Sequence, residues 1–119
     1  MAKVADSLIS LYKIALPFCD RKKIALNLDL LDPSLDADLE QRQLTNQLKP
    51  YLQNAIMRTS QGSITLGARS NRRTIEIFIK DTGQAIPKTE RDQMSTNRLD
   101  IHSRHGYGTT ITLKFDKKP

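Results

Sequence analysis

The chain of 119 residues has the length of one ordinary domain, and its 38% hydrophobic content supports an aliphatic core without tryptophan. This composition excludes collagen-like, low-complexity and wholly disordered proteins. Nineteen Lys and Arg residues oppose 13 Asp and Glu residues, and the net charge of +6 favours anionic partners. The basic residues are scattered and lack interleaved stacking aromatics, so an ordinary solvated surface is favoured over nucleic-acid binding. We expect a single domain over 1–119, with residues 116–119 as a tail.

No stretch is apolar enough to cross a membrane, and the N-terminus lacks the basic and then apolar pattern of a signal peptide. Cys19 is the single cysteine and cannot form an internal disulfide. A reducing, cytoplasmic setting is therefore the simplest interpretation. Because Cys19 lies within a helical pattern, we expect it to be a buried, small apolar residue.

Apolar residues at helical spacing predict two long helices. The first carries a stripe of five residues, Val4, Leu8, Leu11, Ala15 and Phe18. The second carries Leu44, Leu48, Leu52, Ala55 and Thr59, with Ile56 beside them. Pro17 should loosen the last turn of the first helix, and Pro50 should kink the second helix or split it in two. Asp36 or Asp38 can cap the start of the second helix, and Gln61-Gly62 is expected to close it.

Alternating hydrophobicity predicts the strands. The alternating sets are Ile24, Leu26, Leu28 and Leu30; Ile64, Leu66 and Ala68; Ile75, Ile77 and Ile79; and Ile111, Leu113 and Phe115. The second and third sets form a hairpin. We expect a loop over residues 32–34 and a short helix over 88–94. A mobile stretch is expected over 95–98, followed by a short strand over 99–103 and a turn over 104–108.

This order of elements predicts an α+β fold, a two-layer sandwich in which both long helices cover one face of a mixed, mostly antiparallel sheet. The apolar sets of the strands should point toward the helices, because a sheet that faces water on its other side needs only one apolar face.

Asn54 is a polar residue that adjoins the apolar stripe of the second helix. Its carboxamide oxygen could bind a cation such as Mg²⁺, which prefers oxygen ligands. Alternatively, it caps a neighbouring backbone group at the edge of the interior, and the residue taken alone favours this second role.

Residues 81–87, Asp-Thr-Gly-Gln-Ala-Ile-Pro, directly follow a predicted strand. The carboxylate of Asp81 could accept the exocyclic amino group of adenine, the donor that proteins read on this base. Gly83 would let the backbone approach a flat ring, and Ile86 would form an apolar floor. The same residues also fit an ordinary Asp-Thr-Gly turn that leaves a strand.

Residues 106–110, Gly-Tyr-Gly-Thr-Thr, could cradle a phosphate through backbone N–H groups, but such cradles usually precede a helix. Here a strand pattern follows, which favours a hairpin turn. His102 and His105 have no Cys or carboxylate pattern to complete a metal site, so surface histidines near a turn are favoured.

Together these motifs resemble the ATP-binding domain of sensor histidine kinases, within the wider GHKL superfamily of the Bergerat fold that includes gyrase and MutL. Residues 39–59 and then 62–64 resemble the family's asparagine-bearing helix and the strand after it. Residues 75–87 resemble the strand and the Asp-x-Gly-x-Gly-Ile-Pro box, and residues 108–113 resemble the last glycine-threonine box. The three matches keep the family's order over nearly the whole chain.

The resemblance implies a role for four residues. Asn54 matches the Mg²⁺-binding asparagine, and Asp81 matches the aspartate that recognises adenine. Gly83 matches the glycine packed against the base. Thr109 matches the threonine that supports adenine contacts through water.

The chain also departs from the family. Pro50 stands where a first Asn or an acidic residue is usual, and Met57 stands where a phosphate-contacting Lys is common, with Arg58 adjacent. Ala85 replaces the second glycine of the Asp box. Only 11 residues separate Pro87 from Leu99, too few for the family's flexible lid, glycine-rich phosphate cradle and further helix.

The resemblance therefore implies an ATP- and Mg²⁺-binding kinase module of two-component signalling with a weakened phosphate side, which we do not expect to be active alone. Its partners would be a histidine-bearing dimerisation domain or a response regulator, because His102 and His105 lie on a turn rather than on a dimerisation helix. The alternative is a degenerate, non-catalytic module that keeps the fold and binds a protein partner.

Overall fold

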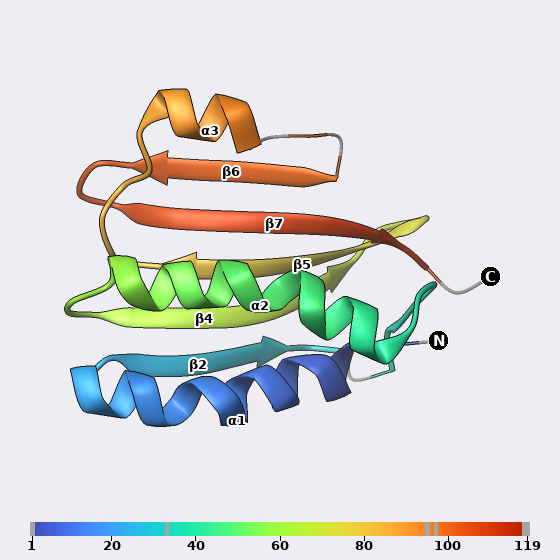
Figure 1. Cartoon of the computed structure of the whole chain (residues 1–119). Coiled ribbons are helices and arrows are strands. Elements are labelled where there is room, and N and C mark those ends of the chain that lie inside the picture. The colour runs from blue at the N-terminus through green and yellow to red at the C-terminus, as the bar shows by residue number, and fades with distance from the viewer. Residues whose placement is uncertain (1, 33, 95, 97, 118–119) are drawn as a thin grey trace.

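The computed structural model describes residues 2–32, 34–94, 96 and 98–117. In chain order its elements are β1 (Ala2–Lys3), α1 (Val4–Lys22), β2 (Ala25–Leu30), β3 (Asp36–Ala37), α2 (Gln41–Arg58), β4 (Ser63–Ser70), β5 (Thr74–Asp81), α3 (Lys88–Met94), β6 (Leu99–Arg104) and β7 (Gly108–Asp116) (Figure 1). Pro33 of the predicted loop, Ser95 and Asn97 of the predicted mobile stretch, and residues 118–119 of the predicted tail lie outside the described residues.

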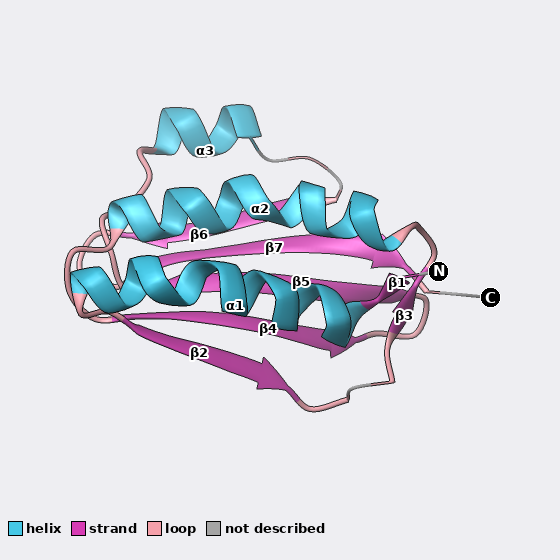
Figure 2. Ribbon diagram, turned by 60° about the horizontal axis from the view of Figure 1, so that its bottom comes forward, coloured by secondary structure: helices cyan, strands magenta, loops and turns pink. Residues whose placement is uncertain are grey.

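Two layers make up the fold. A five-stranded sheet has the order β2-β4-β5-β7-β6, in which β2 is parallel to β4 and the other neighbours are antiparallel. Helices α1 and α2 lie side by side across one face of this sheet, and α3 lies beside the edge strand β6 (Figure 2). The predicted α+β sandwich with both long helices on one face is confirmed.

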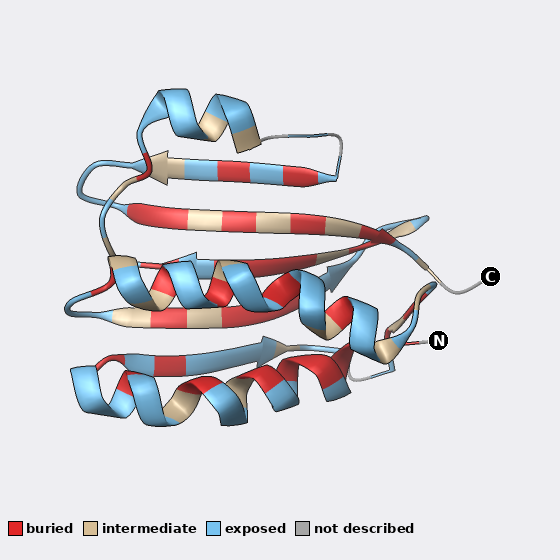
Figure 3. Cartoon of the chain, viewed as in Figure 1, coloured by how far each residue is buried: buried red, intermediate tan, exposed pale blue. Residues whose placement is uncertain are grey.

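The core lies between the helices and the sheet. The inward residues of β5 and β7 are buried as their alternation predicts, and Figure 3 shows buried residues alternating with less buried ones along β6 and β7. Leu28 is an exception, because its side chain is exposed although Leu26 in the same strand is buried. Both residues lie in β2, the edge strand beside β4.

Helix α1 continues through Pro17 to Lys22, and its buried stripe ends on Cys19 rather than on Phe18. Phe18 is half exposed, so its predicted place in the core stripe is wrong. The stripe advances by four residues from Ala15, and a three-residue step turns Phe18 onto the flank of the helix. A loosening of the helix at Pro17 stays a prediction.

Helix α2 begins with a capping box in which Gln43 Oε1 accepts the N–H of Glu40, so the predicted capping by Asp36 or Asp38 is wrong. Asp36 instead belongs to β3, which pairs with β1. Two-residue strands are too short to show alternation, so the sequence analysis missed this small sheet.

The α2 helix runs unbroken across Pro50, which excludes two separate helices there, while a kink at this proline stays a prediction. The helix ends at Arg58, before Gly62, because the buried Thr59 adopts an extended conformation and its hydroxyl donates to the carbonyl of Ala55 at 2.8 Å. Closure of the helix by Gln61-Gly62 is therefore wrong, although Gly62 does have a positive φ of 110°. None of the helices in the described residues is both long and apolar enough to cross a membrane.

We expect Cys19 to resist alkylation while the protein is folded. Burial raises the pKa of its thiol, and the charge of Asp20 raises it further, so little of the reactive thiolate forms. Treatment with iodoacetamide at pH 8, read by mass spectrometry, should label the protein only after urea unfolds it. Rapid labelling in native buffer would contradict the buried position.

Candidate functional site

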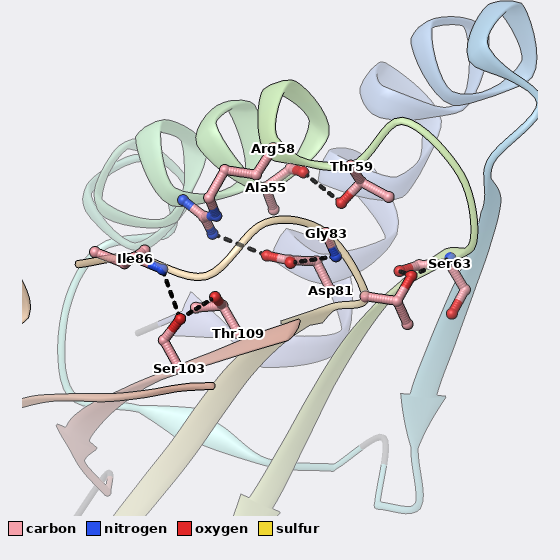
Figure 4. A network of polar contacts seen from close by, with 10 residues as sticks. Ala55, Arg58, Thr59, Ser63, Asp81, Gly83, Ile86, Ser103 and Thr109 are labelled. Carbon is pink, nitrogen blue, oxygen red and sulfur yellow. Dashed lines mark hydrogen bonds and ion pairs between the residues drawn. The ribbon is translucent and has the colours of Figure 1, made fainter. Parts of the chain in front are cut away.

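Asp81 ends β5, a strand with neighbours on both sides, where it pairs in register with Ile64 of β4 and Thr109 of β7. Its carboxylate is 0% exposed and holds two partners. Oδ1 accepts the N–H of Gly83 at 2.9 Å, and Oδ2 lies 2.8 Å from Nη2 of Arg58 at the end of α2 (Figure 4). A buried carboxylate is tolerated because its charge is paired and hydrogen-bonded.

The loop after β5 packs against the end of α2. A Cβ atom on Gly83 would lie 2.4 Å from the carbonyl oxygen of Arg58, which also accepts the N–H of Gln84 at 3.0 Å. Only glycine therefore fits at this position. The predicted break of the strand after Asp81 is confirmed, and the close approach that Gly83 allows in this structure is to the helix end.

Thr109 is buried beside Asp81 and joins a chain of hydroxyl contacts. Its Oγ1 lies 2.7 Å from Oγ of Ser103 in β6, and that Ser103 oxygen accepts the N–H of Ile86 at 2.6 Å. These hydrogen bonds connect the loop over residues 84–87 to β6 and β7 (Figure 4). The sequence analysis missed Ser103. The two-residue alternation of this strand could have revealed it, because Ser103 follows the buried Leu99 and Ile101 on the inward face.

Gly108 opens β7 with a φ of 89°, and a Cβ atom there would lie 2.0 Å from the carbonyl oxygen of Asp81. Residues 104–108 form the hairpin turn between β6 and β7, as predicted. Both histidines near this turn are exposed. In the described part of the chain, no group of three or more His, Cys, Asp or Glu side chains could hold a metal ion.

A cavity of about 380 Å³ lies between α2, the loop over 84–87 and α3. Its lining residues are Asn54, Met57, Arg58, Gln84, Ala85, Ile86, Pro87, Glu90 and Met94. Of the five residues predicted for the site, Asn54 and Ile86 line the cavity. Asp81, Gly83 and Thr109 cluster at the ends of β5 and β7 but are not among the lining residues. Arg58 belongs to both groups and joins the cavity to the buried carboxylate.

The polar cluster at the end of β5 and β7 therefore lies beside a cavity, where α2 ends against the sheet of an α+β domain. Several solved structures share the fold of this chain. The nucleotide-free catalytic domain of the histidine kinase ThkA aligns with a TM-score of 0.87 and 13% identity over 98% of this chain and 95% of that chain. Full-length ShkA in complex with AMPPNP aligns with a TM-score of 0.86 and 14% identity over 98% of this chain and 30% of that chain.

The structure of ThkA in complex with the response regulator TrrA aligns with a TM-score of 0.82 and 15% identity over 98% of this chain and 41% of that chain. No family model and no curated protein matches the sequence. The chain therefore has the fold of the catalytic ATP-binding domains of histidine kinases, and the resemblance read from its sequence is confirmed at the level of the fold.

Proposed function

We propose that this chain is a nucleotide-binding domain of the histidine-kinase kind that binds Mg-ATP weakly and acts in two-component phosphoryl signalling. The observation that carries the proposal is the buried carboxylate of Asp81, set in register with Thr109 at the end of the sheet and beside a cavity. A carboxylate can accept a hydrogen bond from the amino group of a nucleobase.

The residues present fit an adenine nucleotide in part. The cavity falls within the size range of small-molecule sites, and Ile86, Pro87 and Met94 give it apolar walls for a flat ring. Asn54 and Glu90 line the same cavity with oxygen atoms of the kind that Mg²⁺ prefers, and Asn54 would hold the ion. When bound, Mg-ATP would supply the phosphoryl group and the charge neutralisation that its transfer needs.

The part of the site that would hold the phosphates of ATP has few groups to bind them, which supports weak nucleotide binding. Eleven residues separate Pro87 from Leu99, and α3 takes seven of them. Among the cavity-lining residues the one cation is Arg58, whose Nη2 is directed at Asp81. Each missing charged contact costs about 1.5–3 kcal/mol, so affinity should lie nearer to millimolar than to micromolar, a difference of about 4 kcal/mol. ADP and ATP should then bind about equally.

The proposed partners are a histidine-bearing dimerisation domain and a response regulator, in keeping with the ThkA structure that contains a response regulator. A second candidate is a degenerate module that keeps this fold and binds a protein rather than ATP. It is favoured by one observation: Asp81 does not line the cavity, because its carboxylate is fully buried against Arg58.

Replacing Asp81 with asparagine should abolish nucleotide binding. The amide has one oxygen, and if that oxygen keeps the N–H of Gly83, then its NH₂ group faces the adenine amino group as donor against donor. In NMR titrations with Mg-ATP and Mg-ADP, the wild-type amides of Gly83 and Ile86 should shift at millimolar ligand, and those of Asp81→Asn should not.

Asp116→Asn is the matched control, since the described partner of that carboxylate is Arg98 at the surface, so this variant should leave the titration unchanged. Micromolar ATP binding with a strong preference over ADP would refute the weakened phosphate side. If wild type shows no shifts at several millimolar nucleotide, the degenerate module remains.

A further inference from the structure

We propose that Arg58 sets the affinity and the base selectivity of this site by covering the Asp81 carboxylate; the proposal rests on the nucleotide-binding function above. Nothing in the sequence motifs gives Arg58 this role. The residue stands beside Met57, where a contact to phosphate was the natural expectation, yet its guanidinium turns inward to the carboxylate instead.

Access to the carboxylate supports this role. The side chain of Asp81 is 0% exposed, whereas that of Arg58 is 17% exposed and lines the cavity. A base held against Ile86 in the cavity would therefore meet the guanidinium before it could reach the carboxylate, which Figure 4 shows in contact with Arg58. Adenine can donate its amino hydrogen to Asp81 only after Arg58 moves aside.

The covering contact can be displaced. Arg58 makes one described hydrogen bond, from Nη2 to Asp81, and its Nε is buried with no hydrogen-bond partner in the described residues. A buried donor without a partner disfavours the covered conformation, since water would satisfy that donor if the side chain swung out. The site therefore has a covered and an open conformation, and nucleotide competes with the guanidinium for the same carboxylate.

This competition sets the apparent affinity. If only a fraction of molecules is open, the apparent dissociation constant exceeds the intrinsic one by the inverse of that fraction. A hydrogen bond between charged groups commonly corresponds to about a tenfold to hundredfold bias. Removing the guanidinium should therefore tighten ATP binding by about tenfold or more, the reverse of what the loss of a ligand contact would do.

Selectivity should change as well. Adenine presents an amino donor where guanine presents the O6 acceptor. A guanidinium that covers the carboxylate favours an acceptor, whereas an uncovered carboxylate favours a donor. The ratio of ATP affinity to GTP affinity should therefore rise by at least about fivefold when Arg58 is removed, and a purely structural role for Arg58 would not move this ratio.

The test is to titrate wild type, Arg58→Met and Arg58→Gln with Mg-ATP and Mg-GTP, following the amides of Gly83 and Ile86 by NMR. Methionine keeps a long apolar stem but donates no hydrogen bond. Glutamine still donates to Asp81 through a weaker neutral hydrogen bond, so its effect should be intermediate. Arg98→Met is the matched control, because Arg98 pairs with Asp116 at the surface.

Thermal melting followed by circular dichroism first establishes which variants fold, because Arg58→Met leaves a buried carboxylate without its cation. If that variant does not fold, Arg58→Gln decides the test. Tighter ATP binding and a raised ATP-to-GTP ratio in the Arg58 variants alone support the proposal. Equal binding by wild type and Arg58 variants overturns it and leaves the nucleotide-binding function intact. An absence of shifts in every protein, the Arg58 variants included, overturns that function and this proposal with it.

Discussion

Replacing Asp81 with alanine should destabilise the folded protein by about 3–5 kcal/mol. The carboxylate is fully buried, and it is the described partner of both the Arg58 guanidinium and the Gly83 N–H. Its removal leaves a largely buried cation and a backbone donor without their acceptor, and an unpaired buried charge costs more than the pair contributed. Urea unfolding followed by circular dichroism measures the change in the free energy of unfolding.

The matched control is Asp116→Ala. Asp116 also pairs with an arginine, Arg98 at 3.1 Å, but these side chains are 62% and 57% exposed. An exposed pair contributes about 0–1 kcal/mol, so the control should lose no more than that. Equal losses in the two variants would contradict the buried pairing at the end of β5. Unlike alanine, the asparagine variant at position 81 keeps a hydrogen-bonding group and should stay folded.

Replacing Leu48 with alanine should cost about 2–5 kcal/mol. Leu48 lies on the inward face of α2 and is fully buried in the cluster that joins both helices to the sheet. Truncation removes buried methyl groups and leaves a cavity that the packed neighbours fill only in part. The free energy of unfolding in urea measures the loss.

Leu31→Ala supplies the same chemical change in solvent. Leu31 is 89% exposed, so this variant should stay within about 0.5 kcal/mol of wild type. A domain of this size has a total stability of about 5–15 kcal/mol, so Leu48→Ala could remove a large part of it. A loss below about 1 kcal/mol at Leu48 would mean that α2 does not pack on the sheet as described.

Local periodicity was enough to predict most of the elements. The α3 helix spans residues 88–94 as expected, and β6 needed only one further residue, Arg104. The spacing of apolar residues along α1 and α2 also predicted that both helices cover one face of the sheet. The two long helices and the alternating strands follow from the 3.6-residue and two-residue repeats, which a sequence displays directly, whereas α3 was expected from a polar stretch without such a repeat.

Packing decided the details at the ends of elements. Whether Phe18 or Cys19 completes the α1 stripe depends on how the helix is rotated against α2 and the sheet, which the spacing leaves open. Several acidic residues precede α2, and the sequence alone does not show which of them caps the helix. Glu40 took that role while Asp36 paired in β3, a strand that exists only because β1 lies beside it.

The sequence by itself determined the order of the motifs, and the resemblance of those motifs assigned Asp81, Gly83 and Thr109 to the proposed site. The structure pairs Asp81 and Thr109 in register across β5 and β7. Only the tertiary structure decided that Arg58, 23 residues before Asp81, would cover this carboxylate, and that Ser103 would link Thr109 to Ile86. The physical reason is that a side-chain pairing depends on where α2 ends relative to β5. That distance is set by packing across the core, and no residue pattern along the chain records it.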